Sequence, residues 1–323
     1  MTSNLSPKRE VKGALREYGA YPSKKLGQNF IIDNSVIKKF LKVADLKPKD
    51  TVLEIGPGPG NLTQEIAGSV KRVIAVEKDP RMCEILKESL KDFGNVEIIQ
   101  GDILKVGVQN PKSEVRNPKQ ILNSKFQIPK TYKVMGNLPF YLTSPVIRKF
   151  LEDRNPPEEM VLFVQKEVAQ RICSRPPKMN LLAVSVQFYA KPEIAGYVSK
   201  KSFWPQPKVD SAIIKITPRK PLMNPGLVDL FFEIVRAGFS HPRKQLANNL
   251  TKNLKLNTRA VAKGKEENLF SSTRDKVIIW LEKNKIQPSQ RAETLEIKDW
   301  VRLTQSFTRA RRSRAKGGDE GKL

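Results

Sequence analysis

The chain has 323 residues, of which 39% are apolar, enough for about two domains with filled cores. Its 59 lysines and arginines exceed its 33 aspartates and glutamates, so the net charge is +26. Nucleic acid is the partner that fits this excess best, because binding to a phosphate backbone is driven by counterion release. A solubility adaptation and, less favoured, an acidic membrane surface are the alternatives.

Two cysteines, Cys83 and Cys173, stand far apart and outside any metal-ligand spacing, so we expect reduced side chains and no structural metal. No apolar run reaches the roughly 18 residues of a membrane span. The first ten residues lack the apolar stretch of a secretory signal. These features predict a cytoplasmic protein that does not associate with membranes, and we expect a monomer.

Short β-branched runs alternate with helical patterns over the first half of the chain. A helix is expected over 36–44, after the capping-type residues 33–35. The runs typical of buried parallel strands are 51–55, 72–77, 95–99, 132–137 and 160–165. Crossover helices are expected over 61–70 and 80–91. This order predicts an α/β fold, a Rossmann-like doubly wound domain.

The second half begins with a last strand of the sheet over 209–216 and then becomes helical. Apolar residues at helical spacing occupy 227–239, 244–254, 274–283 and 295–307. We therefore divide the chain into an α/β domain (1–218), a linker (219–226), a small all-helical RNA-binding domain (227–307) and a basic disordered tail (308–323). The polar, proline-punctuated stretch 106–130 is expected to be a surface insertion within the first domain.

A glycine-rich turn follows the first strand, in the segment 52–60, VLEIGPGPG. Gly56 and Gly58 stand where the backbone has to pass close to a ligand and where side chains would block it. Such a turn is a weak signal alone, because dinucleotide-binding proteins and ordinary tight turns share it. Its neighbours therefore decide its meaning.

Two acidic residues stand at the ends of consecutive strands. Glu77 ends the second strand, where a carboxylate can accept both hydroxyls of a ribose, and Asp102 follows the third, where it can accept from an adenine amino group. Either residue alone could equally be a helix N-cap or a solvated loop carboxylate. An NAD-dependent enzyme would share Glu77, but it has no use for the tetrapeptide that follows the fourth strand.

That tetrapeptide, Asn137-Leu138-Pro139-Phe140, has the groups that methyl transfer to adenine N6 requires. The Asn137 side-chain oxygen and the Leu138 carbonyl could accept the two N6 hydrogens, while Pro139 fixes the turn and Phe140 stacks on the base. No strong general base is needed, and the single histidine, His241, is better explained as a surface or capping residue. Without the cofactor residues, an ordinary strand-ending turn would be the favoured interpretation.

An adenine inside a helical stack could not reach such a pocket, so the target base has to be unpaired or flipped out. Phe203, in the proline-rich segment 201–208, is a second candidate to hold that base on an aromatic face. Composition alone supports equally well a role for Phe203 and Trp204 as hydrophobic plugs.

The chain resembles the ribosomal RNA adenine N6-dimethyltransferases that act on two adjacent adenosines near the 3′ end of small-subunit (16S) rRNA. The matching segments are Lys25-Leu26-Gly27-Gln28-Asn29-Phe30, Glu54-Ile55-Gly56-Pro57-Gly58, Val76-Glu77, Gly101-Asp102, Gly136-Asn137-Leu138-Pro139-Phe140, Gln165-Lys166-Glu167-Val168, Phe203, Pro207-Lys208-Val209-Asp210-Ser211 and Arg291-Ala292-Glu293. Such a set, spread in order over nearly the whole chain, is highly specific.

The resemblance implies a class I methyltransferase domain, S-adenosylmethionine as cofactor, and 16S rRNA or a 30S assembly intermediate as partner during ribosome biogenesis. The residues that it implies for the cofactor are Asn29, Ile31, Gly56, Gly58, Glu77, Asp102 and Asn137. It assigns the target base to residues 137–140 and its positioning to Phe203. Residues 28–30 are expected to close over the cofactor.

Two alternatives remain. A large-subunit (23S) rRNA methyltransferase of the macrolide-resistance type shares the fold and the cofactor site, but Leu138 and the segment 207–211 favour the small-subunit enzyme. A non-catalytic assembly factor is disfavoured by the intact Gly56, Glu77, Asp102 and Asn137. Phe140 stands where the family often has tyrosine, which keeps the stacking face and removes a hydroxyl.

Overall fold

The structure, a computed structural model, describes residues 7–106, 128–220, 222–254 and 274–317. The chain divides into two units, which are Met1–Gln170 with Ala190–Arg219 and Arg171–Tyr189 with Lys220–Leu323. Most of the predicted insertion 106–130 lies outside the described residues.

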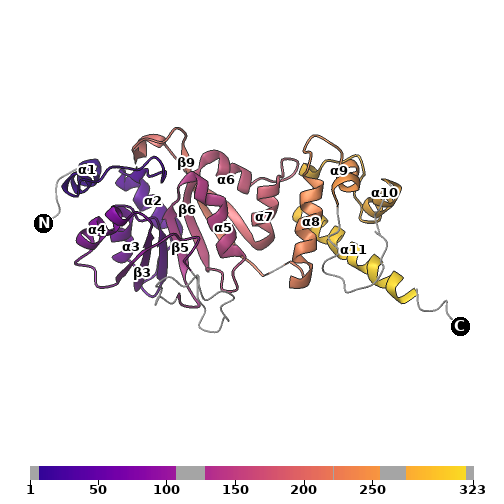
Figure 1. The fold of residues 1–323 in the computed structure, drawn as a ribbon, viewed down its shortest axis with the longest axis horizontal. Helices are drawn as coiled ribbons and strands as arrows, with labels where there is room; N and C mark the ends of the chain where they lie inside the picture. The colour runs from indigo at the N-terminus through magenta and orange to yellow at the C-terminus, as the bar shows by residue number, and fades with distance from the viewer. Residues whose placement is uncertain (1–6, 107–127, 221, 255–273, 318–323) are drawn as a thin grey trace. The chain divides into compact units, whose positions relative to one another are not determined.

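Seven strands of the first unit form one sheet in the order β4-β3-β2-β5-β6-β9-β7 (Figure 1). Their bounds are β2 (Thr51–Ile55), β3 (Arg72–Glu77), β4 (Val96–Gln100), β5 (Lys133–Asn137), β6 (Glu159–Gln165), β7 (Ala190–Val198) and β9 (Ser211–Pro218). Strands β2 to β6 are parallel, whereas β9 runs antiparallel to both of its neighbours. The predicted Rossmann-like α/β fold is confirmed, and β7 is a strand that the sequence did not predict.

Register aligns the carboxyl ends of β5, β6 and β7. Asn137 pairs with Phe163, Phe163 with Ile213 of β9, and Ile213 with Gly196 of β7. Residues just beyond Asn137 and Gly196 therefore emerge at one edge of the sheet. Ligands of open α/β sheets bind at this edge, outside the carboxyl ends of the parallel strands.

Helices cover this sheet and pack apolar faces on it. Their bounds are α2 (Asn34–Ala44), α3 (Asn61–Ala67), α4 (Pro80–Ser89), α5 (Thr143–Leu151) and α6 (Lys166–Ile172). Asp33 caps α2 and Asp79 caps α4, each by accepting backbone N–H groups of the first turn. Phe40 of α2 stacks on Phe163 of β6, with ring centroids 4.2 Å apart, which fixes the helix over the middle of the sheet.

An N-terminal helix, α1 (Pro7–Glu17), precedes these elements and was not predicted. Its Val11 and Leu15 are buried against Met82 and Ile85 of α4. The chain then forms a two-residue strand, β1 (Phe30–Ile31), antiparallel to β8 (Phe203–Trp204). Segment 18–29, between α1 and β1, is thus anchored at both ends.

The second unit is helical, as predicted, with one addition. Its helices are α7 (Leu181–Tyr189), α8 (Val228–Gly238), α9 (Leu246–Asn253), α10 (Arg274–Lys283) and α11 (Ile297–Gly317). Phe188 of α7 packs on Phe231 of α8 with centroids 4.3 Å apart. Residues Arg171–Tyr189, which the sequence pattern places in the first domain, therefore belong to this core.

The tail differs from its prediction as well. Helix α11 continues to Gly317, so most of the segment 308–323 is helical backbone rather than disordered, and 318–323 lie outside the described residues. The predicted linker ends in a short 3₁₀ turn at Pro225–Leu227.

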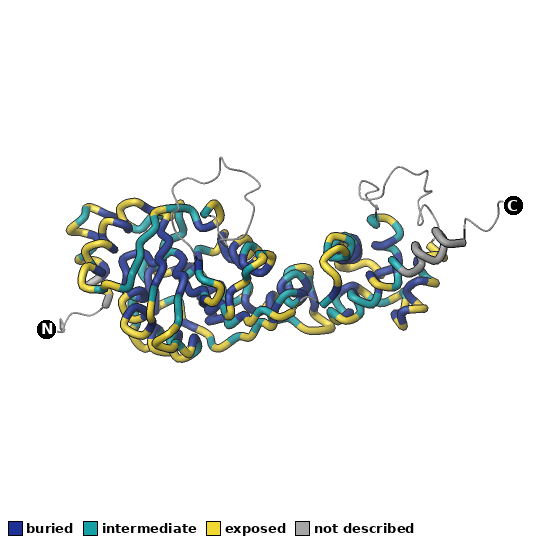
Figure 2. The backbone as a smooth tube through the Cα atoms, turned by 90° about the horizontal axis from the view of Figure 1, so that it is seen from below, coloured by how far each residue is buried: buried dark blue, intermediate teal, exposed yellow. Residues whose placement is uncertain are grey.

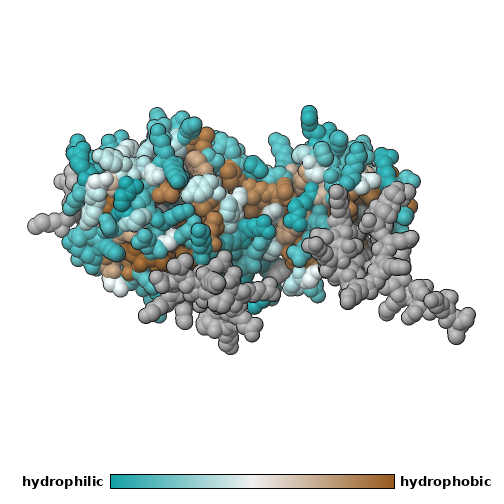
Figure 3. Space-filling model, viewed as in Figure 1, coloured by the Kyte–Doolittle hydropathy of each residue, from teal (hydrophilic) through white to brown (hydrophobic). Residues whose placement is uncertain are grey.

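Burial is concentrated in the strands and in the inner faces of the helices (Figure 2). The surface seen in Figure 3 is largely hydrophilic, with smaller hydrophobic areas between. Among the described residues, no helix is both long and apolar enough to span a bilayer.

Candidate active site

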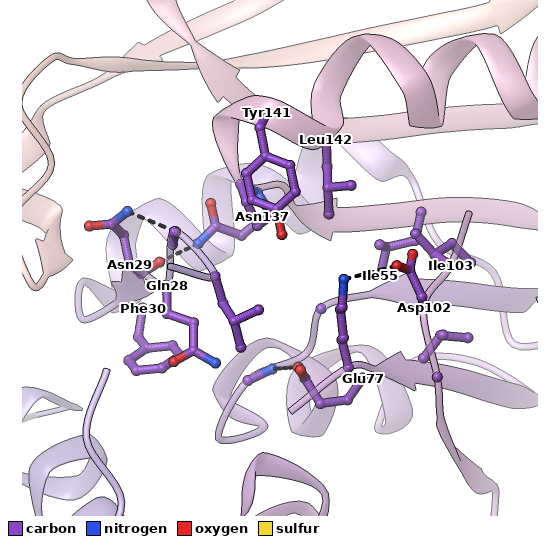
Figure 4. Close-up of a pocket in the computed structure, with 18 residues that line it drawn as sticks. Gln28, Asn29, Phe30, Ile55, Glu77, Asp102, Ile103, Asn137, Tyr141 and Leu142 are labelled. Carbon is purple, nitrogen blue, oxygen red and sulfur yellow. Dashed lines mark hydrogen bonds and ion pairs between the residues drawn. The ribbon is translucent and has the colours of Figure 1, made fainter. Parts of the chain in front are cut away.

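An open pocket of about 640 Å³, its mouth included, lies at the carboxyl ends of β2, β3 and β5 (Figure 4). Residues from five segments line it, which are 26–30; 55, 56 and 58; 76–78; 101–103; and 137, 139, 141 and 142. All of them except the first are strand ends or the turns after them. The pocket is therefore a product of the parallel sheet, closed on one side by the N-terminal segment.

The glycine turn after β2 is required by backbone conformation and by space. Gly56 and Gly58 have φ values of +65° and +59°, a region that L-residues rarely adopt. A Cβ on Gly58 would lie 2.8 Å from the Phe30 ring, whereas one on Gly56 would meet no atom within 4 Å. Gly58 thus lets Phe30 pack against the turn, and Gly56 leaves room beside the pocket.

Glu77 is 5% exposed and its carboxylate is held in place by the backbone. One oxygen accepts from the Gly58 N–H at 3.1 Å and the other from the Asp79 N–H at 2.8 Å. Burial raises the pKa of Glu77, while these hydrogen bonds oppose the rise. Each carboxylate oxygen can accept a further hydrogen bond, so Glu77 can also receive ligand hydroxyls.

Asp102 lines the pocket on the same side as Glu77, after the neighbouring strand β4 (Figure 4). Its two oxygens accept from the Leu104 N–H at 3.0 Å and from Lys78 Nζ at 2.9 Å. Burial alone would raise the pKa of Asp102, but the bonds to Lys78 and Leu104 and the positive charge of Lys78 lower it. Asp102 is therefore an anionic acceptor, and Lys78 is a pocket residue that the sequence did not reveal.

Lys149 of α5 supports the turn after Asp102 from behind. Its Nζ donates to the carbonyls of Leu104 and Val106 at 3.2 and 2.6 Å. Burial lowers the pKa of Lys149. The side chain fixes the backbone that follows Asp102, a role that no sequence spacing indicates.

Asn137 ends β5 and faces the N-terminal segment. Its Nδ2 donates to the Asn29 carbonyl at 2.5 Å, and Asn29 Nδ2 donates in turn to the Gly27 carbonyl at 3.1 Å. With the amino group of its amide held this way, the Asn137 oxygen is directed away from Asn29. Leu138 is buried at 3% exposure, and its N–H donates to the Phe163 carbonyl at 3.3 Å.

Gln28 ties the N-terminal segment to the sheet. Its side-chain oxygen accepts from the Ser23 N–H at 2.7 Å, and its Nε2 donates to Asp79 at 3.2 Å. Asp79 also caps α4 directly after Glu77. Residues 23–29 are therefore held over the turn that carries the acidic residue.

The aromatic candidates occupy different environments. Phe140, in the 3₁₀ turn Phe140–Leu142, is 37% exposed, and its neighbour Tyr141 is 52% exposed and lines the pocket. Phe203 is only 3% exposed and makes a T-shaped contact with Phe163 at a centroid distance of 6.0 Å. The structure does not bring Phe203 to the pocket wall.

Most of the predicted site residues nevertheless converge. The pocket wall includes Asn29, Gly56, Gly58, Glu77, Asp102, Asn137 and Pro139. Ile31 lies in an adjoining hollow that also touches Gly56 and Asn137. Within the described ranges, no group of three or more histidine, cysteine or carboxylate side chains is placed to hold a metal.

Comparison with known proteins gives a family match over nearly the whole chain. The family model described as "Ribosomal RNA adenine dimethylase" matches residues 22–308. A Dehalococcoides mccartyi protein named ribosomal RNA small subunit methyltransferase A is 38% identical over 295 residues, 91% of each chain. A Streptococcus thermophilus protein of the same name is 37% identical over 303 residues, 93% of this chain and 97% of that one.

Solved structures show the same similarity. A dimethyladenosine transferase from Plasmodium falciparum has a TM-score of 0.69 and 26% identity, covering 87% of this chain and 98% of its own. The 23S rRNA methyltransferase ErmE has a TM-score of 0.62 at 24% identity, covering 85% of this chain and 98% of its own, a likeness that extends to the fold alone.

Proposed function

The chain belongs to the ribosomal RNA adenine dimethylase family, and from this premise we propose that it dimethylates N6 of two adjacent adenosines near the 3′ end of small-subunit rRNA. It is an S-adenosylmethionine-dependent methyltransferase that acts on small-subunit rRNA. The placement of Asn137 beside the pocket, at the end of β5, is the observation that carries the proposed chemistry.

The pocket has the groups that the cofactor requires. Glu77 and Asp102 are acceptors at the ends of the neighbouring strands β3 and β4, suited to ribose hydroxyls and to the adenine amino group. Gly56 has open space where a side chain would stand, residues 28–30 line the same pocket, and Ile31 lines the adjoining hollow. When bound, S-adenosylmethionine supplies an electrophilic methyl group on a positively charged sulfur.

Residues 137–140 are proposed to hold the target base. The Asn137 side-chain oxygen accepts one N6 hydrogen and the Leu138 carbonyl accepts the other, which directs the nitrogen lone pair toward the methyl group. The hydrogen bond from Asn137 to the Asn29 carbonyl supports this role, because it uses the amino group of the amide and leaves the oxygen to accept. His241 belongs to the helical unit and is not required as a base.

Phe140 is the stacking face that we propose for the base, because more than a third of its side chain is exposed at the turn after Pro139. Phe203 is the second candidate from the sequence. It is buried against Phe163, so its support for the base acts through the packing of the β1–β8 pair rather than through stacking.

Partners and location follow from the substrate. We propose that the helical unit and the basic segment 308–323 contact rRNA, and that the enzyme acts as a monomer on a 30S particle or assembly intermediate in the cytoplasm. Sedimentation of the enzyme alone and with 30S particles tests the monomer and the partner together.

Asn137→Ala tests the chemistry. We expect the methylation rate on 30S particles to fall roughly 100-fold or more, by analogy with the loss of one transition-state hydrogen-bond partner, while affinity for rRNA stays nearly unchanged. Mass spectrometry of nucleosides from treated 30S and 50S particles identifies the product as dimethyladenosine. Wild-type turnover in the variant would contradict the assignment, and label confined to 50S particles would contradict the substrate.

A further inference from the structure

Tyr197 is an exposed aromatic residue that the catalytic pocket does not use. It lies near the carboxyl end of β7 with 51% of its side chain exposed. Lys166, the first residue of α6, places its Nζ 5.3 Å from the centre of the Tyr197 ring. This is the geometry of a cation–π contact, so a half-exposed ring carries a positive charge at its face.

More positive charge lies in the loop between β7 and β9. Lys201 and Lys208 are exposed and Lys200 is partly exposed. Asp210 connects the two segments: its side chain accepts from the Lys200 backbone N–H and its backbone carbonyl accepts from the Lys166 backbone N–H, each at 3.0 Å. We call Lys166, Tyr197, Lys200, Lys201 and Lys208 the Tyr197 patch.

The Tyr197 patch and the tetrapeptide 137–140 lie at the same end of the strands, the end where β5 and β7 terminate. Asn137 and Gly196 stand in one row of paired residues, and Leu138 and Tyr197 are the next residues along their strands. Three strand spacings separate β5 from β7, about 14 Å at the usual spacing. A nucleic acid strand with one base in the pocket could therefore cross the patch with its neighbouring nucleotides.

A flipped base leaves its neighbours partly unstacked, and proteins offset this loss with aromatic side chains and basic residues along the backbone. The patch has four lysines, and the two neighbouring acidic residues, Glu167 and Asp210, offset only part of their positive charge. We propose that Tyr197 and Lys166 form a stacking platform for an RNA nucleotide close to the target adenosine, while Lys200, Lys201 and Lys208 neutralise its phosphates. This inference rests on the proposed function.

Tyr197→Ala and Tyr197→Phe in the full chain test the platform. We expect Tyr197→Ala to raise the KM for 30S particles about tenfold, equivalent to about 1.4 kcal/mol, with the effect on KM rather than on kcat. Tyr197→Phe keeps the ring and should stay within about twofold of wild type. Lys191→Ala is the matched control, because Lys191 lies on the same strand but pairs with Glu193 at 2.8 Å, at the opposite end of β7.

Each result separates the inference from the proposed function. If the KM is unchanged in Tyr197→Ala and the wild-type enzyme methylates 30S particles, the platform is overturned and the proposed function stands. If the wild-type enzyme does not methylate 30S particles, the proposed function itself is overturned. Weaker binding to 30S particles but not to their extracted RNA would assign the patch to a ribosomal protein and overturn the inference too. If Tyr197→Ala does not fold, ultraviolet cross-linking of the wild-type complex decides. An rRNA-linked peptide containing Tyr197 supports the platform, and cross-links only elsewhere overturn it.

Discussion

At the scale of single residues, Glu54 is a carboxyl group in an unusual place. It lies in β2, an interior strand of the sheet, with 1% of its side chain exposed, and one of its oxygens has no hydrogen-bond partner. Desolvation raises its pKa from 4.5 to about 8. Glu54 is therefore protonated in the folded protein at neutral pH, and ionising it there costs free energy.

Glu54 makes the stability of the fold depend on pH. Between about pH 4.5 and 8 the unfolded chain has lost the Glu54 proton and the folded protein keeps it, so the wild-type free energy of unfolding falls as pH rises. Glu54→Gln removes this loss. We expect the free energy of unfolding of the variant, relative to that of wild type, to increase by up to about 1.4 kcal/mol for each unit by which pH rises within that window.

Urea unfolding of both proteins at several pH values measures this difference. The exposed Glu84 of α4 supplies the control, since Glu84→Gln should leave the difference from wild type flat across the same range. A flat difference for Glu54→Gln would mean that Glu54 is ionised in the folded protein.

The sequence predicted the anionic and amide residues of the site and missed its cations. Glu77, Asp102 and Asn137 could be found because each ends or follows a strand whose type and direction are readable from β-branched residues. Lys78 and Lys149 could not, because a lysine in a chain with 59 basic residues reads as surface charge. Their roles depend on contacts to Asp102 and to backbone carbonyls that only the folded chain brings together.

At the scale of elements, α1 packs against α4 and anchors one end of segment 18–29. Leu15 is 2% exposed in a cluster with Phe30 and Ile85. Leu15→Ala removes about 2–5 kcal/mol of packing, and because α1 packs through this small cluster the loss acts locally. We expect faster hydrogen exchange over 18–31 and a cofactor Kd roughly tenfold higher, equivalent to about 1.4 kcal/mol.

Gly13→Ala is the matched variant, and we expect it to stabilise α1 where Leu15→Ala weakens its packing. A Cβ on Gly13 meets no atom within 4 Å, and alanine favours a helix over glycine by about 0.5–1 kcal/mol. Calorimetry with S-adenosylmethionine and exchange measurements on both variants test the link. Unchanged exchange over 18–31 in Leu15→Ala would show that α1 does not hold the segment.

Strand β7 shows where element prediction from sequence fails. Pro192 and Gly196 break the β pattern, and both are tolerated because β7 pairs with β9 alone, at the edge of the sheet. Its alternating burial appears only once the pairing is known. The parallel strands were predictable, by contrast, because burial on both faces makes them continuous apolar runs.

At the scale of the whole molecule, the boundary between the two units is not a single point in the sequence. Helix α7 joins the helical unit because Ala183, Val184 and Phe188 are buried in its core, and the chain then returns to the sheet as β7. A boundary drawn from composition near residue 218 could not show this, since α7 is apolar on all sides and reads equally well as part of either unit.

Charge is the whole-molecule property that the proposed function uses. The segment 308–323 has six basic and two acidic residues, and α11 carries its backbone to Gly317. Deleting the segment should weaken binding to 30S rRNA and flatten its salt dependence. The slope of the logarithm of the binding constant against the logarithm of the salt concentration should become shallower by roughly 0.7–0.9 for each phosphate that the protein no longer neutralises. Cofactor affinity should not change, because the pocket is formed by the first unit alone.

A charge variant separates the contribution of the arginines from that of the helix. Changing Arg309, Arg311, Arg312 and Arg314 to glutamine keeps the length and the helix propensity of the segment while removing four positive charges. If the arginines contact phosphates, this variant reproduces the smaller salt slope of the deletion, because counterion release depends on charge and not on chain length. Titration of labelled rRNA at several salt concentrations measures both slopes. A wild-type slope in the glutamine variant would show that the segment does not contact RNA through its charge.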